Sequence, residues 1–364
     1  MQRKCVIFVV VLLFLLPVNS FAHTQGNAEH QLYSLGDFKL VNGEVIRDFS
    51  ISYVTHGTLN ESKDNAILMT SSLAGNHHRV DYLIGKGKAY DPDKYFIICT
   101  DAIGNGLTTS PSNSKSQPGM KFPRYSIQDM VNSQHRLVTE KFGLTKLLVV
   151  TGASMGGMQS LQWGASYPDM VQTIVAIIPL GKAGPWMKLQ CEAMRRAIML
   201  DPAWDNGNYT SQPEKGMKLW ATLLFGLAVN TPQAINENFD GDTKKALEWL
   251  AKRDELLWKA IDANDFIIQS EACDSFDLGQ TPGFDGDYVK ALASIKAKTL
   301  MLSGSGDILC PEDEAKFAAD HIPNATFKLI APPRKRGHGA GTDWTAPEAA
   351  FQNEEITKFL QKAQ

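Results

Sequence analysis

The sequence has few cysteines, with only five in 364 residues. A small exported protein stabilised mainly by disulfides has a much higher density, so such a framework is excluded. The cysteine spacing matches no metal motif, and no H-E-x-x-H pair occurs, which argues against a metal hydrolase. We expect Cys99 to be a buried strand residue. Cys191 and Cys273 lie in the same middle region and are candidates for one disulfide bond.

The chain also lacks a strong excess of charge of either sign. Its 36 Lys and Arg residues nearly balance 39 Asp and Glu residues, for a formal net charge of −3. Because the chain has no excess of basic residues, nucleic-acid binding is not expected.

The sequence shows no internal repeat and no low-complexity tract. Its length and its 43% hydrophobic content are ample for one large core, or for a core with a smaller inserted domain.

The apolar run at residues 5–16 is shorter than the roughly 20 residues that a membrane-spanning helix needs. Arg3 and Lys4 precede this run, and Ser20-Phe21-Ala22 follows it as an A-x-A-like cleavage site. The pattern predicts a signal peptide over residues 1–22, cleaved after Ala22. No cysteine follows the cleavage site, so lipid anchoring is not indicated. We expect an exported protein, periplasmic or secreted, with no stable membrane span in the mature chain.

Short apolar segments alternate with helical patterns along the rest of the chain. This alternation predicts an α/β fold with a mostly parallel sheet covered by helices on both faces. A further segment, residues 43–55, is expected to be an exposed strand. The buried-strand candidates are residues 65–71, 94–100, 147–150, 171–178, 298–303 and 326–330.

Residues 181–290 interrupt the alternation. This stretch is rich in helix-forming residues and tryptophan, and its amphipathic segments predict helices without intervening strands. We interpret it as a helical cap over an active site, inserted into a core made of residues 23–180 and 291–364.

The apolar run at residues 147–150 leads into Gly152-Ala153-Ser154-Met155-Gly156, and a helical pattern follows. A G-x-S-x-G sequence between a strand and a helix is the nucleophile elbow of α/β-hydrolase folds. The turn requires residues without side chains two positions before and after the serine. It also places the hydroxyl at the positive end of a helix. The motif predicts that Ser154 is a nucleophile in an α/β-hydrolase fold.

A nucleophilic serine needs a base, and the base needs an orienting acid; in this fold the chain order is Ser, Asp or Glu, then His. Asp307 lies in the loop after residues 298–303, where the acid is expected. Glu312 and Asp313 are rivals, but they fit the first turn of a predicted helix over 311–322, where acidic residues favour the helix dipole. We therefore predict Asp307 as the acid.

His338 is the histidine that follows the last predicted strand on a loop, so it is the predicted base. His321 falls inside a predicted helix and is interpreted as a surface residue. His77 and His78 are adjacent, and we interpret them as poorly placed to share a metal ion.

The charged tetrahedral intermediate of acyl transfer needs two hydrogen-bond donors. One is expected to be the N–H of Met155, directly after the nucleophile. The other is expected in the loop at residues 71–75, after an early strand, where Leu73 is the best candidate donor and Gly75 permits unusual backbone geometry.

Several motifs outside these residues resemble those of the homoserine O-acetyltransferase family. They include Gly104-Asn105-Gly106-Leu107, Ser110-Pro111-Ser112-Asn113 and, in the cap, the run from Ala197 to Trp204. The resemblance extends over nearly the whole mature chain. It implies a ping-pong reaction in which Ser154 takes an acyl group from an ester or thioester and passes it to an alcohol. It also implies a homodimer formed through the cap.

Three positions depart from that family's pattern. The family holds homoserine with a cap arginine and with an aspartate directly after the catalytic histidine, where this chain has Ala221 and Gly339. Ser71 replaces a histidine usual at the start of the oxyanion loop. Burying the carboxylate or ammonium of homoserine without a partner costs several kcal/mol. The departures, and an exported location away from acyl-CoA donors, argue against homoserine as the acceptor.

Three functions are compatible with the sequence. The favoured one is an exported serine hydrolase that cleaves a small-molecule ester or related acyl bond with water. The alternatives are an O-acyltransferase that uses an alcohol other than homoserine, and a non-catalytic binding protein on a hydrolase scaffold. No cofactor and no metal are expected.

Overall fold

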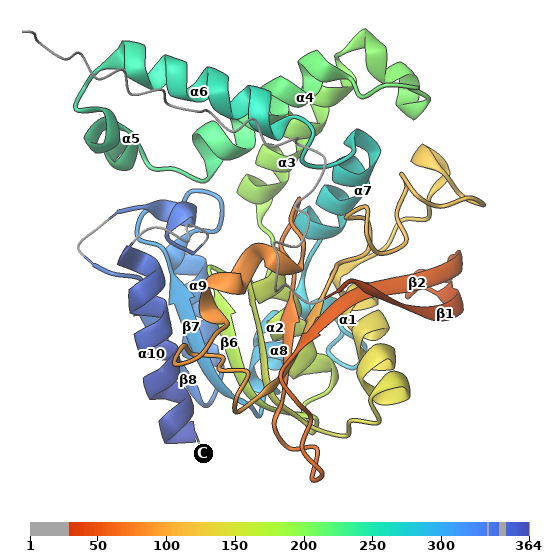
Figure 1. Cartoon of the computed structure of the whole chain (residues 1–364), viewed down its shortest axis with the longest axis vertical. Coiled ribbons are helices and arrows are strands. Elements are labelled where there is room, and N and C mark those ends of the chain that lie inside the picture. The colour runs from red at the N-terminus through yellow and green to blue at the C-terminus, as the bar shows by residue number, and fades with distance from the viewer. Residues whose placement is uncertain (1–28, 333–334, 342–346, 364) are drawn as a thin grey trace, which may run out of the picture.

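A computed structural model describes residues 29–332, 335–341 and 347–363, and in these ranges eight strands form one sheet (Figure 1). Their order is β1-β2-β4-β3-β5-β6-β7-β8. The β1/β2 and β2/β4 pairs are antiparallel, and all pairs from β4 to β8 are parallel. The predicted α/β fold with a mostly parallel sheet is therefore confirmed. The strands are β1 (Gln31–Lys39), β2 (Val45–His56), β3 (Ala66–Thr70), β4 (Phe96–Thr100), β5 (Leu147–Ala153), β6 (Val171–Ile177), β7 (Lys298–Ser303) and β8 (Ala325–Leu329).

Alternate residues of the inner strands face opposite sides of the sheet. Leu68 and Val150 belong to one buried apolar cluster, whereas their neighbours Ile67 and Val149 belong to another. The first cluster includes side chains of α1, α2 and α9, and the second includes side chains of α10. Helices thus cover both faces. These helices are α1 (Ile127–Arg136), α2 (Met155–Ser166), α9 (Glu312–His321) and α10 (Pro347–Ala363).

The first two strands differ from the prediction. The segment expected to be an exposed strand is β2, and its residues Ile51 and Tyr53 are at most 1% exposed. They are buried because they face the side of the sheet whose apolar cluster also contains side chains of α1 and α2. Strand β1 was not predicted from the sequence.

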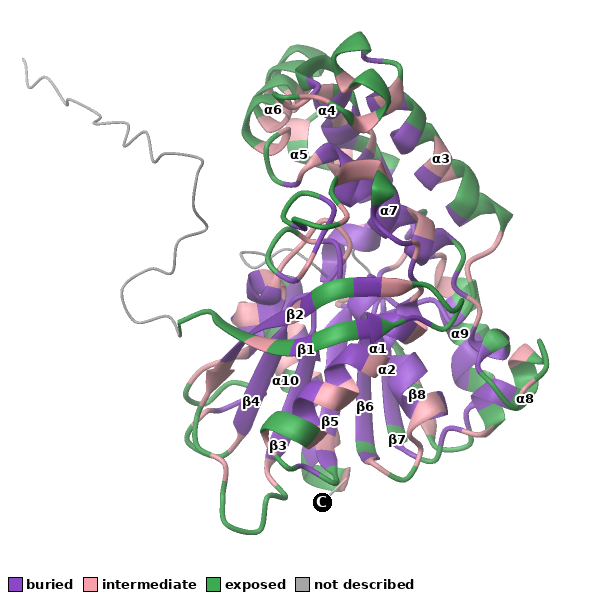
Figure 2. Cartoon of the chain, turned by 90° about the vertical axis from the view of Figure 1, so that its right-hand side faces the viewer, coloured by how far each residue is buried: buried purple, intermediate pink, exposed green. Residues whose placement is uncertain are grey.

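Between β6 and β7 the chain forms a group of helices at the top of Figure 1, above the sheet. This is the segment for which a helical cap was predicted. Much of this group is exposed, and its buried residues lie mainly on the helices closer to the sheet (Figure 2). The helices are α3 (Pro185–Met199), α4 (Glu214–Ala221), the π-helix η5 (Thr222–Ala228), α5 (Pro232–Phe239), α6 (Thr243–Leu257), α7 (Ala263–Asp274) and, nearer the sheet, α8 (Tyr288–Ala293).

The four cysteines in the described ranges are free and buried. Cys99 lies in β4, as predicted. The disulfide considered for Cys191 and Cys273 does not form. The Cys273 thiol instead packs against the Met158 sulfur at 3.7 Å, and burial raises the pKa of the Cys191 thiol to about 12.

Among the described residues, no helix has both the length and the apolar character needed to cross a membrane. The predicted signal peptide, residues 1–22, lies outside the described residues.

Candidate active site

Ser154 lies in the sharp turn between β5 and α2, with φ 58° and ψ −123°. A non-glycine residue with positive φ is strained and needs support from its surroundings. The two flanking glycines make the turn possible. A Cβ on Gly152 would lie 2.3 Å from Thr70 Oγ1, and one on Gly156 would lie 2.5 Å from the Thr70 carbonyl oxygen. The glycines at these positions are therefore sterically required, as the motif predicted.

Asp307 lies in the loop after β7, and its Oδ1 atom accepts hydrogen bonds from the backbone N–H groups of Leu309 and Cys310, both at 2.8 Å. These bonds fix the carboxylate. Gly304 in the same loop permits a close backbone approach, because a Cβ there would lie 1.9 Å from the Gly337 carbonyl oxygen. The approach brings the Asp307 loop against the loop that carries His338.

The His338 ring connects the other two predicted residues. Its Nδ1 atom lies 2.8 Å from Asp307 Oδ2, and its Nε2 atom lies 2.9 Å from Ser154 Oγ. Because a carboxylate only accepts, Nδ1 carries the proton, which leaves Nε2 to accept from the serine hydroxyl. All three side chains are buried. The structure thus places Ser154, His338 and Asp307 in the geometry of a nucleophile, base and orienting acid.

The rival acids lie where the helix pattern predicted. Glu312 and Asp313 are both in the first turn of α9. The Glu312 carboxylate accepts a hydrogen bond of 2.9 Å from the Gly306 N–H, so it supports the loop that carries Asp307.

The candidate oxyanion loop, residues 71–75, is held by hydrogen bonds on both sides of Leu73. The Ser72 hydroxyl donates to the Ala153 carbonyl at 2.7 Å, and the Ala74 N–H donates to Gln269 Oε1 at 2.9 Å. Within the described part of the chain, the Leu73 and Met155 N–H groups donate no hydrogen bond. Both remain available for a ligand oxygen.

The loop that carries His338 is also attached to the cap. The Gly339 N–H donates to the Val229 carbonyl at 2.8 Å, and the Thr231 hydroxyl donates to the Lys335 carbonyl at 2.5 Å. A Cβ on Gly339 would lie 3.3 Å from the Val229 oxygen, so a larger residue would strain this contact. Ala221, the other departure from the family pattern, is fully buried at the end of α4. Neither position presents a charge.

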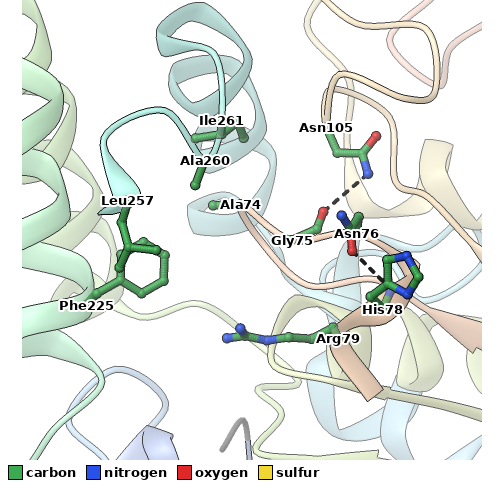
Figure 3. A pocket seen from close by; sticks show the side chains of 10 residues that line it. All are labelled: Ala74, Gly75, Asn76, His78, Arg79, Asn105, Phe225, Leu257, Ala260 and Ile261. Atoms are coloured by element: carbon green, nitrogen blue, oxygen red, sulfur yellow. Dashed lines mark hydrogen bonds between the residues drawn. The ribbon is translucent and has the colours of Figure 1, made fainter. Parts of the chain in front are cut away.

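A pocket with about 140 Å³ of free volume lies between the core and the cap (Figure 3). Ser154, Asp307 and His338 are not among its lining residues, but Ala74 and Gly75 connect it to the candidate oxyanion loop. Its cap side is mostly apolar, which suits a small organic substrate. The lining residues are Ala74, Gly75, Asn76, His78, Arg79, Asn105, Phe225, Leu257, Ala260 and Ile261.

Arg79 places a cation in this pocket, a feature that the sequence analysis missed. Its side chain extends into the space between Gly75 and Phe225 (Figure 3). Burial and the nearby Arg253 lower the pKa of the Arg79 guanidinium. Among the described residues, no carboxylate forms an ion pair with Arg79, and its buried Nε atom has no hydrogen-bond partner. Arg79 is thus available to a ligand.

The interpretation of His77 and His78 as poorly placed to share a metal ion is wrong on geometry. Both lie at the start of the 3₁₀-helix η1 (His77–Leu83), and their ring centroids are 4.2 Å apart. Side chains of successive residues in a 3₁₀-helix point about 120° apart around the helix axis, so neighbours would ordinarily diverge. Here tertiary contacts turn the two rings toward each other.

Comparisons with known proteins show which family the chain belongs to. The alpha/beta hydrolase fold family model matches residues 65–334. The homoserine O-acetyltransferase of Nostoc punctiforme is 34% identical over 326 residues, which cover 85% of this chain and 90% of that protein. Some other curated relatives of the same name are longer, and the chain spans only 62% to 65% of their length.

Two solved structures are similar over nearly their whole length. The acetyl esterase MekB matches with a TM-score of 0.84 and 30% identity, covering 92% of this chain and 97% of that one. An acetylester hydrolase from Corynebacterium glutamicum matches with a TM-score of 0.83 and 28% identity, covering 92% and 96%. The resemblance inferred from the sequence is confirmed. The chain is an enzyme of the serine hydrolase type and belongs to the α/β-hydrolase fold family, in the group that includes homoserine O-acetyltransferases and acetyl esterases.

Proposed function

We propose that this enzyme is a hydrolase that forms an acyl-enzyme on Ser154 and cleaves an ester or related acyl bond with water. The observation that carries the proposal is the position of the His338 ring, 2.9 Å from Ser154 Oγ and 2.8 Å from Asp307 Oδ2. An imidazole held between a hydroxyl and a carboxylate can remove the hydroxyl proton during attack on a carbonyl carbon.

In the first half-reaction, Ser154 Oγ bonds to the acyl carbon while its proton moves to His338 Nε2. The carbonyl oxygen becomes an oxyanion, which the N–H groups of Leu73 and Met155 stabilise. Asp307 stabilises the imidazolium that forms. The tetrahedral intermediate then expels the alcohol, which takes the proton from His338 Nε2 and leaves the acyl group on Ser154.

In the second half-reaction, a water molecule gives a proton to His338 Nε2 and attacks the acyl carbon through its oxygen. The second tetrahedral intermediate collapses, and Ser154 Oγ leaves and regains its proton from His338. The free acid is released. An alcohol in place of water would give transfer by the same steps, so the acceptor decides between hydrolase and transferase.

Two observations favour water over homoserine. Ala221 is buried and apolar, and Gly339 is engaged with the cap through Val229, so neither supplies the charged group that the family has at its position to hold homoserine. The similar structures of acetyl esterases show that this architecture accommodates ester hydrolysis in other proteins. Transfer to a different alcohol is the alternative, since curated relatives carry the name of a transferase.

Product partition tests the choice of acceptor. With p-nitrophenyl acetate, we expect acetate to be released in the same amount as p-nitrophenol, even with homoserine or simple alcohols in excess. An acetylated alcohol as the main product would instead identify a transferase. No turnover of any short-chain ester, together with no labelling of Ser154 by a fluorophosphonate, would identify a binding protein.

Arg79 indicates the class of substrate. A cation in a pocket, with no anionic partner among the described residues, favours a substrate that carries a carboxylate or another anion. We expect Arg79→Gln to lower kcat/KM for the p-nitrophenyl ester of succinic acid by about 10- to 100-fold, because a hydrogen bond to a charged group contributes about 1.5–3 kcal/mol. The neutral ester of butanoic acid should change by less than about threefold.

The matched control is Arg196→Gln, which removes an exposed arginine of α3 that pairs with Glu192. It should leave both esters unaffected. Equal losses for the succinic and butanoic esters in the Arg79 variant would contradict the preference for an anion while leaving the hydrolase proposal intact.

Export is also part of the proposal. Its support is the basic, apolar and A-x-A-like pattern of residues 1–22, so the natural location is periplasmic or extracellular.

A further inference from the structure

Three histidine side chains converge beside the pocket. His30 lies directly before β1, and His77 and His78 begin η1. The His77 ring centroid is 4.3 Å from that of His30 and 4.2 Å from that of His78. One ring nitrogen of each histidine lies within 4.8 Å of those of the other two. Residues nearly fifty positions apart in the sequence thus form one imidazole cluster.

The Nδ1 atoms of the two buried rings are held by carboxylates. His77 Nδ1 lies 3.0 Å from Asp101 Oδ2, and His78 Nδ1 lies 2.7 Å from Asp81 Oδ2. Because an ionised carboxylate can only accept, each Nδ1 carries its proton and donates. In the neutral form of each ring, the lone pair is therefore on Nε2.

The same reasoning applies to His30, through a serine. The Ser52 hydroxyl donates its proton to Asp101 Oδ2 at 2.8 Å. Its oxygen therefore accepts from His30 Nδ1, which lies 3.2 Å away. All three neutral rings then have the same tautomer, with the lone pair on Nε2.

We propose that His30, His77 and His78 bind a divalent transition metal through their Nε2 atoms. Histidines that bind a metal commonly donate their other N–H to a carboxylate or similar acceptor, which orients the ring and raises its basicity. Here Asp101 and Asp81 have that role and offset the charge of the ion. Three imidazoles suit Zn²⁺, Ni²⁺ or Cu²⁺, whereas Mg²⁺ and Ca²⁺ prefer oxygen ligands.

The ligand spacing requires a small adjustment. Two nitrogens that each lie about 2.0–2.1 Å from a tetrahedral Zn²⁺ are about 3.4 Å apart. Ring nitrogens that lie up to 4.8 Å apart must therefore move closer by up to about 1.4 Å. His30 can supply this movement, because its side chain is 30% exposed, compared with 1% for His77. A bound ion would join the start of β1 to η1, immediately after the candidate oxyanion loop.

The test is titration of the tag-free, EDTA-treated and dialysed protein with Zn²⁺ alone, followed by calorimetry. We expect about one bound equivalent. His77→Ala should weaken binding by at least about 100-fold, and Asp81→Asn by about 10- to 100-fold, the range for loss of a carboxylate that orients a metal ligand. His321→Ala, in α9 and bonded to the Phe317 carbonyl, is the control and should bind as the parent does.

Absence of binding by the parent would overturn the proposal. So would equal binding by the His77 variant, which would show an adventitious ion only. His77→Ala could fail to fold because Asp101 loses its buried partner. In that case the Zn²⁺ affinity of Asp81→Asn is the test, and an affinity equal to that of the parent would overturn the proposal. The result is separate from the proposed hydrolysis, because Ser154→Ala should bind Zn²⁺ as the parent does.

Discussion

Ser154→Ala is expected to lower kcat for p-nitrophenyl acetate by about 10⁴-fold or more, the loss typical of removing a serine nucleophile. The Oγ atom is the only part of the side chain that is removed. The strained turn at φ 58° carries a Cβ in both proteins, so its backbone energy should not change. Steady-state rates and fluorophosphonate labelling measure the effect. We expect the variant to be unlabelled and to melt within a few degrees of the parent.

Ser160→Ala is the matched control for this substitution. Ser160 is buried in the same helix, and its hydroxyl donates to the Gly156 carbonyl at 2.9 Å without contacting His338. Its loss should cost about 1 kcal/mol of stability and leave kcat within a few-fold. If Ser154→Ala retained most of the activity, the acyl-enzyme on this residue would be excluded.

The sequence was sufficient to predict the inner strands and the candidate site because both depend on local patterns. The apolar run before Gly152, and the loops after β7 and β8, identify the carboxyl ends of parallel strands, which lie at one edge of the sheet. The chain order of nucleophile, acid and base then selects Asp307 and His338. Steric contacts at Gly152 and Gly156 explain why the motif is so restrictive.

Features that depend on distant contacts could not be predicted in this way. Strand β1 alternates poorly between buried and exposed residues, so its sequence carries a weak strand signal. The orientation of the His77 ring is set by Asp101, which follows β4. That Arg79 lines a pocket without a paired carboxylate among the described residues becomes visible only in the folded structure. The positions of two residues in the sequence do not determine whether their side chains make contact, because that depends on the tertiary structure.

The second large effect is expected from Asp307→Asn, which should lower kcat by about 10⁴-fold although the two side chains have nearly the same shape. In the parent, Oδ1 accepts from the N–H groups of Leu309 and Cys310. An asparagine keeps its carbonyl oxygen toward these two donors, because its NH₂ group would repel them. The NH₂ group must then face His338 Nδ1.

That orientation inverts the hydrogen bond to the ring. Nδ1 becomes the acceptor, so the neutral imidazole carries its proton on Nε2 and can no longer accept from Ser154 Oγ. The control is Asp313→Asn, in the exposed first turn of α9, which should leave kcat within a few-fold. Because Ser154, His338 and Asp307 act as a unit, adding Asp307→Asn to Ser154→Ala should cause little further loss of kcat. A kcat within tenfold of the parent for Asp307→Asn, in a folded protein, would mean that Asp307 does not set the tautomer of His338.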